Sequence, residues 1–398
     1  MHRQNDWENP LITGIGREAM HMLAGGFGNA KEAFETDRYG SRFFAMLNGD
    51  WQFHLAESPE QVPAEFQQDN FDASDWETIP VPGNWELQGH DRPIYTNIPY
   101  PFKPAQPPNT PPENPTGCYR TPFTIPNGWE QRETFLLFES VDSAFYVWIN
   151  GEPVGYGQDS KLPSEFNITA HLRSGENLLA VQVMRWSDGS YLEDQDYWHL
   201  SGIQRDVIIY SKPKAHLRDL CVTTSFTDNH YRDAALHVRA YTNNLENPEA
   251  YSIEAELFDD DGEPVLHAPL EEVVSSSSPM YHGSNLERCS AFMAETVKAP
   301  NQWTPEAPHL YTMVVTLRNS DGKAVDWERA RVGFRQVEIK NGVVLLNGRR
   351  LIVRGVNRHE FHHERGRALT RDDMIAEIRR IKQLNFNAVR TSHYPNSP

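Results

Sequence analysis

The chain has 398 residues, of which 38% are hydrophobic and 23% charged, which is enough for two or three domains with cores of their own. Its formal net charge of −18 would repel the phosphates of nucleic acids and of anionic membranes, so neither is an expected partner. We expect a cytoplasmic protein, because no run of 18 apolar residues and no secretory signal is seen and the three scattered cysteines, Cys118, Cys221 and Cys289, argue against a disulfide framework.

The first 212 residues predict an arm followed by a β-domain. Residues 1–42 have weak hydrophobic periodicity and a glycine-rich stretch, so we interpret them as an extended arm. In residues 43–212, short apolar runs alternate with turn signals, as at Phe135–Phe138, Phe145–Ile149 and Leu178–Met184. Short strands spaced in this way are typical of a jelly roll or another β-sandwich.

A proline-rich segment, Pro99–Pro115, interrupts this β-domain, and eight of its 17 residues are proline. Such a density of proline excludes a helix or a strand interior and predicts a stiff, largely polyproline loop. We interpret the loop as a surface connection, with a direct binding role as the less favoured alternative.

Residues 213–337 predict a second β-domain. Leu236, Val238 and Ala240 alternate with other side chains at a period of two, and the same period recurs from Ile253 onward. One face of each strand is therefore expected to be buried. A domain of about 120 residues built from such strands predicts an immunoglobulin-like sandwich.

The last segment begins with a predicted hairpin. Asn347 and Gly348 are the pair that a two-residue type I′ turn prefers, so Val343–Leu346 should turn back into Arg350–Arg354. We interpret Arg350–Arg354 as a strand that Gly355 ends, with a polar loop after it.

A helix and a second strand follow this loop. Thr370 and Asp373 have the spacing of a capping box, and apolar side chains recur at helical spacing up to Leu384. Asn385 ends the helix, and Asn387–Val389 is expected to form a short strand. The order strand, polar loop, helix, strand, polar loop is typical of the start of an α/β barrel or a doubly wound sheet.

Histidine and arginine side chains follow both predicted strands. Arg358 and His359 come after the first, and Arg390 and His393 come after the second. In α/β folds, chemistry collects at the C-terminal ends of the strands, because the loops converge there on a rigid scaffold. We therefore expect a functional site here; the alternative is that these histidines are merely exposed to solvent in a loop.

Two motifs in this segment carry a family resemblance. RGVNRHE (Arg354–Glu360) followed by NFNAVRTSHYP (Asn385–Pro395) resembles glycoside hydrolase family 2, and specifically its long lactose-splitting β-galactosidases. The resemblance implies that residues 338–398 are the start of a (β/α)8 catalytic barrel, truncated after its first strands and helix. The whole chain is then expected to be a multidomain, mostly β protein with arm, jelly-roll sugar-binding domain, immunoglobulin-like β-sandwich and incomplete barrel.

The activity implied by the resemblance is the hydrolysis of terminal β-D-galactose residues in β-galactosides such as lactose, with retention. A retaining glycosidase needs one carboxyl group as acid and base and a second as nucleophile. In the family both follow later barrel strands, so we expect them beyond Pro398 and expect this chain to be inactive alone. Glu360 is not assigned to either role.

Four residues of this chain match the family's substrate-binding positions: Asn97 in YTN, Asp196 in YLEDQDYW, and the barrel histidines His359 and His393. The resemblance also makes Asp196 a sodium ligand. A carboxylate accepts strong hydrogen bonds from sugar hydroxyls, and a neutral imidazole can donate or accept them. The neighbouring Glu193 and Asp194 are interpreted as part of a solvated acidic turn.

A peripheral magnesium site is also implied by the resemblance. Its ligands would be Asp6 and Asn9 in DWENP, Gln158 in GQDS and Asp188 in WSDGS. All four offer the hard oxygen atoms that Mg²⁺ prefers. Both Mg²⁺ and Na⁺ are thus expected cofactors.

Other functions and assemblies stay open. A non-catalytic carbohydrate-binding protein could use the jelly roll alone, and a β-glucuronidase or β-mannosidase of the same family is the nearest enzymatic alternative. The resemblance implies a homotetramer for the full-length protein. A carboxy-terminal chain that completes the barrel is the other possible partner.

Overall fold

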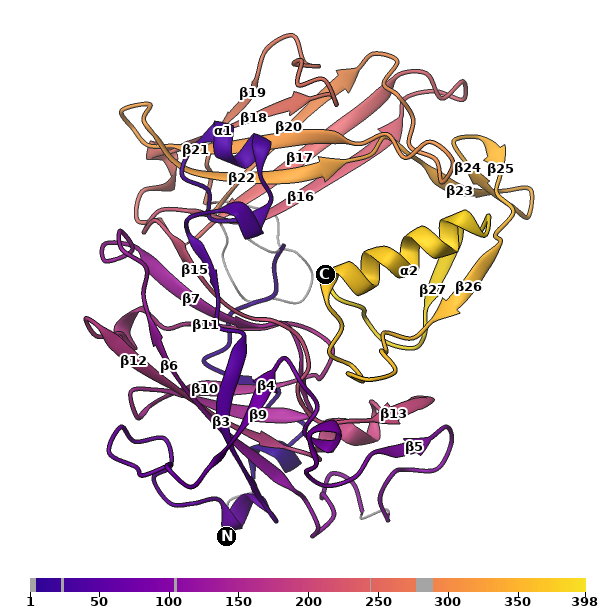
Figure 1. Ribbon diagram of the computed structural model, residues 1–398. Coiled ribbons are helices and arrows are strands. Elements are labelled where there is room, and N and C mark those ends of the chain that lie inside the picture. Colours follow the sequence, from indigo (N-terminus) through magenta and orange to yellow (C-terminus); the bar gives the residue numbers. More distant parts are fainter. Residues whose placement is uncertain (1–4, 23–24, 104–105, 244, 277–288) are drawn as a thin grey trace. The chain divides into compact units, whose positions relative to one another are not determined.

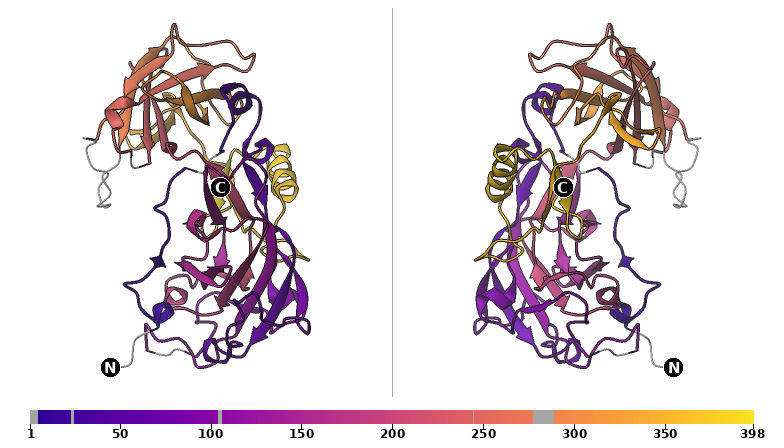
Figure 2. Two further views of the ribbon diagram at one scale, coloured as in Figure 1. Left: turned by 90° about the vertical axis from the view of Figure 1, so that its left-hand side faces the viewer. Right: turned by 90° about the vertical axis from the view of Figure 1, so that its right-hand side faces the viewer.

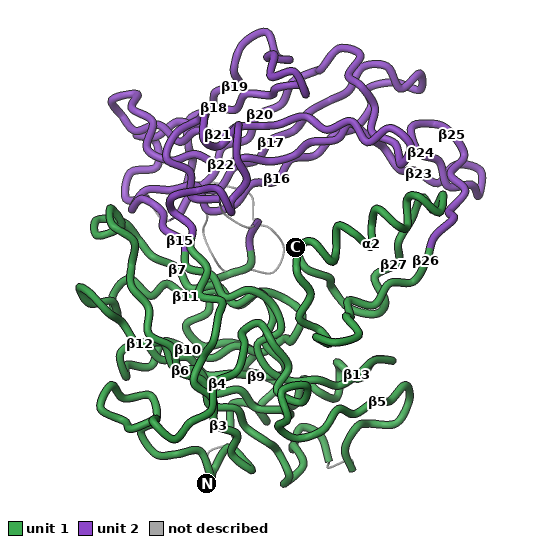
Figure 3. The backbone as a smooth tube through the Cα atoms, in the orientation of Figure 1, with its two compact units in different colours: residues 1–20, 45–209, 356–398 green, residues 21–44, 210–355 purple. Residues whose placement is uncertain are grey.

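Three stretches that are far apart in the sequence form one compact unit of this protein. The structure, a computed structural model, describes residues 5–22, 25–103, 106–243, 245–276 and 289–398. Unit 1 contains residues 1–20, 45–209 and 356–398, and unit 2 contains residues 21–44 and 210–355 (Figure 3). Among the described residues, no helix is long and apolar enough to cross a membrane.

Unit 1 is built on two sheets of a jelly roll (Figure 1). The larger sheet has the order β1-β10-β9-β12-β6-β3-β4, and the smaller has the order β11-β7-β15-β2. The strands of these sheets are β1 (Gly14–Ile15), β2 (Phe44–Met46), β3 (Gly49–Ala56), β4 (Glu77–Val81), β6 (Thr116–Thr124), β7 (Glu133–Phe138), β9 (Ala144–Ile149), β10 (Glu152–Gln158), β11 (Ser164–Asn167), β12 (Glu176–Met184) and β15 (Val207–Lys212). The three apolar runs predicted as strands lie in β7, β9 and β12, as expected.

Two short ribbons extend this jelly roll. β5 (Ile94–Thr96) pairs with β13 (Tyr197–His199), and β8 (Val141–Asp142) pairs with β14 (Gly202–Ile203). The β5–β13 ribbon carries polar and aromatic side chains at its end, and the candidate site is built on it.

The proline-rich segment has neither helix nor strand in its described parts, 99–103 and 106–115, as predicted. It helps to enclose a cavity of about 760 Å³. Ile94 lines this cavity, and since successive strand residues point to opposite faces, the cavity lies on the face of β5 opposite to Tyr95. Phe102 packs on Trp186 there, with ring centroids 5.0 Å apart.

The amino-terminal arm is not extended throughout. Figure 2 shows its first part as a largely irregular indigo segment, which contains the single turn η1 (Asp6–Glu8) and the short strand β1. Further along, α1 (Ala30–Glu35) is a six-residue helix that the weak periodicity did not predict. The Asn29 side chain accepts a hydrogen bond from the backbone N–H of Glu32, so the helix has a local start signal.

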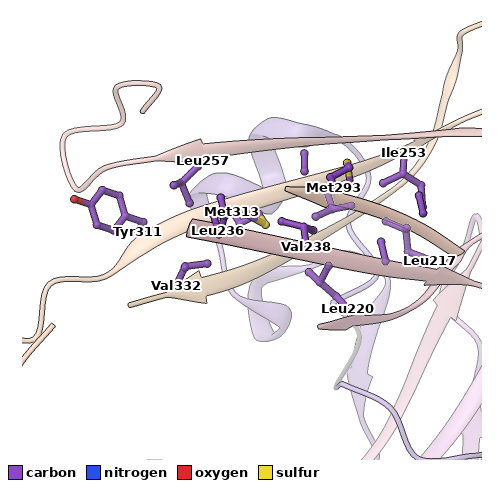
Figure 4. Packing of buried hydrophobic residues seen from close by; sticks show 14 of the residues in the cluster. Leu217, Leu220, Leu236, Val238, Ile253, Leu257, Met293, Tyr311, Met313 and Val332 are labelled. Atoms are coloured by element: carbon purple, nitrogen blue, oxygen red, sulfur yellow. The ribbon is translucent and has the colours of Figure 1, made fainter. Parts of the chain in front are cut away.

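Unit 2 is the predicted immunoglobulin-like sandwich. Its two sheets have the orders β16-β17-β20 and β19-β18-β21-β22. The strands are β16 (Leu217–Phe226), β17 (Ala234–Thr242), β18 (Ser252–Phe258), β19 (Leu270–Val273), β20 (Ser290–Val297), β21 (Tyr311–Arg318) and β22 (Ala324–Val332). The alternating residues Leu236 and Val238 are fully buried in its core, together with Ile253 and Met313 (Figure 4).

The hairpin at the end of unit 2 confirms the predicted turn. β23 (Val337–Lys340) pairs with β24 (Val343–Leu346), which turns back into β25 (Arg349–Arg350). Asn347 and Gly348 have φ angles of 50° and 74°, the positive values that a type I′ turn requires.

The strand expected at Arg350–Arg354 is misplaced, however. Only Arg350 of that run is in a strand, and Gly355, expected to end the strand, instead begins β26 (Gly355–Arg358). The apolar run suggested the earlier position, but Ile352 and Val353 are exposed. Strand assignment follows the hydrogen-bonded partner, and β26 has that partner in β27.

The last part of unit 1 has the predicted order of strand, helix and strand. α2 (Arg371–Gln383) starts with the capping box of Thr370 and Asp373, and β27 (Ala388–Thr391) lies slightly after the predicted position. The backbone N–H of Ser392 donates to the carbonyl of Arg358 at 3.0 Å, so the C-terminal ends of β26 and β27 lie together. The described residues contain this β-α-β start of a barrel and no closed barrel.

Candidate functional site

The β5–β13 ribbon brings two of the predicted substrate residues to the same end. Tyr197 pairs with Thr96 in an antiparallel register, and Asn97 and Asp196 are the residues directly beyond this last pair. Both residues therefore lie at the same end of the ribbon. The Tyr95 hydroxyl donates to Oδ1 of Asp196 at 2.6 Å. This hydrogen bond is the main cause that raises the pKa of Tyr95 above its ordinary value.

The two predicted histidines meet at the ends of β26 and β27. The rings of His359 and His393 are in edge-to-face contact, with centroids 5.4 Å apart. Burial and the neighbouring His393 lower the pKa of His359, while the carboxylate of Asp196 acts in the opposite direction. The ribbon and the barrel segment thus place the Asp196 carboxylate within electrostatic reach of His359, which contacts His393, and the role of these residues in binding a substrate stays a prediction.

Arg367 lies between the residues that flank Asp196 and His393. Its guanidinium covers the ring of Tyr197 at 4.6 Å and the ring of Tyr394 at 4.2 Å. Its Nε donates to Oε1 of Gln204 at 3.1 Å, and its backbone N–H donates to Oδ1 of Asn84 at 2.8 Å. One buried cation therefore holds the jelly roll and the barrel segment of unit 1 together.

A second contact fixes the loop that carries His359. Arg205 donates to Oε2 of Glu360 at 2.7 Å and to the carbonyl of Pro395 at 2.8 Å. The other carboxylate oxygen of Glu360 accepts from the backbone N–H of Ser397 at 2.9 Å, and Arg358 lies 3.6 Å from it. Because Glu360 is only 4% exposed and its carboxylate is bonded on both sides, it has a structural role.

Glu193 does not belong to a solvated turn, as the sequence suggested. It is half-buried, and its carboxylate accepts hydrogen bonds from the backbone N–H and the hydroxyl of Ser160. Burial raises the pKa of Glu193 to about 7. Asp194 also points inward, since its side chain is only 12% exposed and lies 3.6 Å from Nε2 of His199. Asp196, which the motif singled out, is the carboxylate beside Tyr95.

The predicted magnesium ligands fall into neighbouring positions in unit 1. The Tyr146 hydroxyl donates to Oδ2 of Asp6 at 2.7 Å, and Nε2 of Gln158 donates to Oδ1 of Asp188 at 2.6 Å. The turn η1 contacts η6 (Asp188–Tyr191), so the arm reaches Asp188. Asn9 uses its Oδ1 as an acceptor for a backbone N–H of the arm.

The oxygen donors of this set suit Mg²⁺, which binds few carboxylates and retains water. The described residues contain no group of three or more His, Cys, Asp or Glu side chains with metal-binding geometry. The set has two carboxylates and two amides, and Oε1 of Gln158 already accepts a hydrogen bond from the Tyr156 hydroxyl at 2.8 Å.

Several side chains at the site were not predicted. Tyr95 and Trp198 belong to the motifs YTN and YLEDQDYW, which is the signal that could have found them. Arg367 had no such signal, because a polar loop does not reveal which of its charges is buried. Glu8 was passed over as well, although its carboxylate accepts from the Thr110 backbone and hydroxyl at 2.8 Å.

Three family models match consecutive stretches of the chain. "Glycosyl hydrolases family 2, sugar binding domain" matches residues 44–213, "Glycosyl hydrolases family 2" matches residues 215–335, and "Glycosyl hydrolases family 2, TIM barrel domain" matches residues 337–398. Together these matches extend over nearly the whole sequence.

Relatives and solved structures are similar to this chain over most of its length. A beta-galactosidase of Psychromonas ingrahamii is 44% identical over 400 residues, and one of Priestia megaterium is 43% identical over 399 residues. These alignments cover 100% and 98% of this chain but only 37% and 38% of those proteins. The chain therefore spans a little over a third of the length of these curated relatives.

Two solved beta-glucuronidases share the fold. The enzyme of Bifidobacterium dentium, in complex with coumarin-3-O-glucuronide, has a TM-score of 0.73 at 21% identity, covering 90% of this chain and 59% of that one. The enzyme of Bacteroides uniformis has a TM-score of 0.71 at 25% identity, covering 89% of this chain and 40% of that one.

Removing the carboxylate of Glu360 should destabilise unit 1. Glu360→Ala leaves Arg205 buried without its carboxylate partner, which typically costs about 3–5 kcal/mol. The matched control is Glu364→Ala in the same loop, where the side chain is 72% exposed and the expected change is about 0.5 kcal/mol or less. Urea denaturation measures both, and equal effects of the two substitutions would contradict the assigned role of Glu360.

The stability of unit 1 should fall as the pH drops from about 6.5 to about 4, because burial lowers the pKa of His199 to about 4. In this range the unfolded chain binds a proton at His199 and the folded chain does not, so acid favours unfolding. His199→Gln should reduce this slope in urea denaturation, whereas His363→Gln, at an exposed histidine, should not. A slope unaffected by His199→Gln would refute the prediction.

Proposed function

The chain belongs to glycosyl hydrolases family 2, and on that premise we propose that it is the amino-terminal part of a β-galactosidase. The whole enzyme would hydrolyse terminal β-D-galactose residues in β-galactosides such as lactose, with retention of configuration. The observation that carries this proposal is the contact of His359 with His393 within electrostatic reach of the Asp196 carboxylate, in a chain 44% and 43% identical to two curated beta-galactosidases.

In this proposal the chain holds the galactose ring rather than breaking its bond. The carboxylate of Asp196 accepts hydrogen bonds from sugar hydroxyls, and a bond to a charged group contributes about 1.5–3 kcal/mol. His359 and His393 contact the galactosyl group, and Asn97 offers an amide donor and acceptor beside Asp196. Because the pKa of His359 is lowered, its imidazole is neutral near pH 7 and can serve as donor or acceptor without adding a charge.

The acid and the nucleophile are proposed to lie in later barrel strands. The carboxylates of Glu360 and Glu193 are bonded to protein groups, which supports leaving both out of the bond-breaking step. General acid and base catalysis alone contributes a factor of about 10²–10⁴, so a chain without these groups should show no turnover.

Two metal ions complete the proposal. Asp196 would bind Na⁺ next to the sugar, and Asp6, Asn9, Gln158 and Asp188 would hold a hydrated Mg²⁺ that ties the arm to the jelly roll. Oxygen donors suit both ions. The support for the second site is the approach of η1 to η6.

The setting proposed for the full-length enzyme is the cytoplasm, where it would act as a homotetramer. All three cysteines are free, and Cys118 and Cys289 are buried, which agrees with a reducing compartment. The tetramer rests on the family resemblance alone. Association of this chain with a complementing carboxy-terminal chain is the second possible assembly.

Galactose should bind to the 398-residue chain through Asp196. Saturation-transfer NMR with millimolar galactose is expected to show saturation of the sugar protons, and Asp196→Asn should reduce it at least about fivefold, because a charged acceptor is lost. Glucuronate serves as the competing sugar. Preferential saturation of glucuronate would favour a β-glucuronidase, and binding that survives Asp196→Asn would overturn the assigned pocket.

The purified chain should not release nitrophenol from a nitrophenyl β-galactoside above the buffer rate. The test is a prolonged assay at high protein concentration, with His393→Ala as the control for a contaminating enzyme. Turnover that His393→Ala abolishes would show that the chain has its own catalytic groups.

Magnesium should stabilise unit 1 through the arm. A ligand that binds only the folded state at 100 times its Kd adds about 2.7 kcal/mol, so millimolar Mg²⁺ is expected to raise the melting temperature. Asp188→Asn should remove this shift, whereas Asp72→Asn, at an exposed acid of the same unit, should retain it. An unchanged shift in Asp188→Asn would exclude these ligands.

A further inference from the structure

The cavity beside the proline-rich segment is separate from the candidate galactose pocket. Ile94 of β5 lines it, and strand alternation puts Ile94 on the face of the ribbon opposite to Tyr95. It is lined by none of the four predicted substrate residues, which are Asn97, Asp196, His359 and His393. Its volume of about 760 Å³ lies within the range of about 300–1,000 Å³ that is typical of small-molecule pockets. The cavity is therefore large enough for a ligand of its own.

Aromatic rings form one wall of this cavity. Tyr100 and Phe102 are nearly parallel, with planes 14° apart and ring centroids 5.8 Å apart. Phe102 also packs on Trp186, with ring centroids 5.0 Å apart. The other apolar residues of the lining are Ile94, Pro101, Pro111, Pro112 and Pro115. Such a lining suits a ligand with a flat, apolar body.

Hydrogen bonds hold residues 106–115 of the proline-rich segment in place. The backbone N–H of Trp186 donates to Oδ1 of Asn114 at 2.8 Å, and Nδ2 of Asn114 donates to the carbonyl of Trp186 at 3.0 Å. The backbone N–H and the hydroxyl of Thr110 both donate to the carboxylate of Glu8 in the arm. The protein itself therefore shapes the cavity, and binding would require little further ordering of the chain.

A buried arginine fixes the charged side of the cavity. Arg185 is only 2% exposed; its Nη1 donates to the carboxylate of Asp91, and its Nη2 donates to the carbonyl of Arg92 at 3.1 Å. Its charge is offset by Asp91 and by Glu86, whose carboxylate lies 3.7 Å away. Its Nε has no acceptor among the described residues, and a buried donor without an acceptor costs free energy. A ligand that brings an oxygen atom to this side of the cavity would supply one.

The other charged residues of the lining leave one positive charge unbalanced. Arg92 and Lys103 are exposed and form no ion pair with another described residue, and Glu113 is the one carboxylate of the lining that opposes them. Complementary charge determines which ligand such a site selects. Two cations against one carboxylate favour a ligand with a single negative charge, as a carboxylate has, over one with two.

We propose that this cavity binds a small aromatic carboxylate. The aromatic ring of the ligand would stack on the wall of Tyr100, Phe102 and Trp186, and its carboxylate would accept hydrogen bonds from Arg92 and Lys103. The site lies outside the galactose pocket and does not depend on the proposed β-galactosidase function. Because the proline-rich segment and the residues before η6 both contribute rings to the wall, the ligand would join two segments of unit 1 and raise its melting temperature.

Isothermal titration calorimetry of the full 398-residue chain with 2-naphthoate tests the site, with the neutral 2-naphthamide as the matched ligand. Because hydrogen bonds to a charged group are the stronger ones, 2-naphthoate should bind at least about tenfold more tightly. Arg92→Gln combined with Lys103→Gln should reduce this preference to about threefold or less. The control, Arg379→Gln combined with Arg380→Gln, removes two exposed charges of α2 in the same unit and should leave the preference unchanged.

A second variant tests the aromatic wall. Phe102→Ala should weaken the binding of both naphthalene ligands at least about threefold, because it removes the ring contacts, whereas Phe102→Tyr should retain most of the affinity. An excess of galactose should not displace 2-naphthoate from the unaltered chain.

Several results would overturn the site. Absence of binding, or equal affinities for 2-naphthoate and 2-naphthamide, would exclude recognition of the carboxylate. An equal loss of preference in the two double variants would show a general effect of net charge. Displacement of 2-naphthoate by galactose would put the ligand in the galactose pocket. Failure of the proposed galactoside function gives a different pattern, in which galactose does not bind but 2-naphthoate still does.

Discussion

The cation–π contact of Arg367 is the interaction on which the candidate site depends. The guanidinium lies over Tyr197, the residue after Asp196, and over Tyr394, the residue after His393. It is fixed from the jelly-roll side by Gln204 and Asn84. Two sequence-distant loops are thus held through one buried charge, which is far stronger in a desolvated position than on a surface.

This arrangement explains why the jelly roll and the barrel segment form a single unit. The sandwich of unit 2 separates them by more than a hundred residues of sequence, yet Arg205 and Glu360 form a buried ion pair between them. Buried charges are costly unless both partners are hydrogen-bonded, and here both are. The jelly roll therefore supplies part of the pocket and also supports the first barrel loop.

The fold could be predicted from the sequence where local patterns decide the structure. The period of two at Leu236 and Val238, the turn at Asn347 and Gly348 and the cap at Thr370 depend on neighbouring residues, and each was confirmed. The barrel strand was misplaced because its partner strand, which defines it, lies thirty or so residues away. The short helix α1 was missed for a related reason, since six residues are too few to show a period.

The candidate site was accessible to sequence reasoning only in part. The family motifs pointed to Asn97, Asp196, His359 and His393, and the structure brings the last three near one another. Motifs did not reveal Arg367 or the inward position of Glu193, because burial of a charge depends on the partners that folding provides. Trp198 was visible in the sequence, but its exposure was not.

The strict alternation along β13 limits how the loop before it can vary. The loop between η6 and β13 determines which side chains of the strand face outward. A deletion of one residue there would slip the strand by one position, so that Tyr197 and His199, which are buried, would point outward while the exposed Trp198 turned inward. A change of two residues would keep the same side chains exposed. Insertions and deletions of an even number of residues should therefore be tolerated better than those of an odd number.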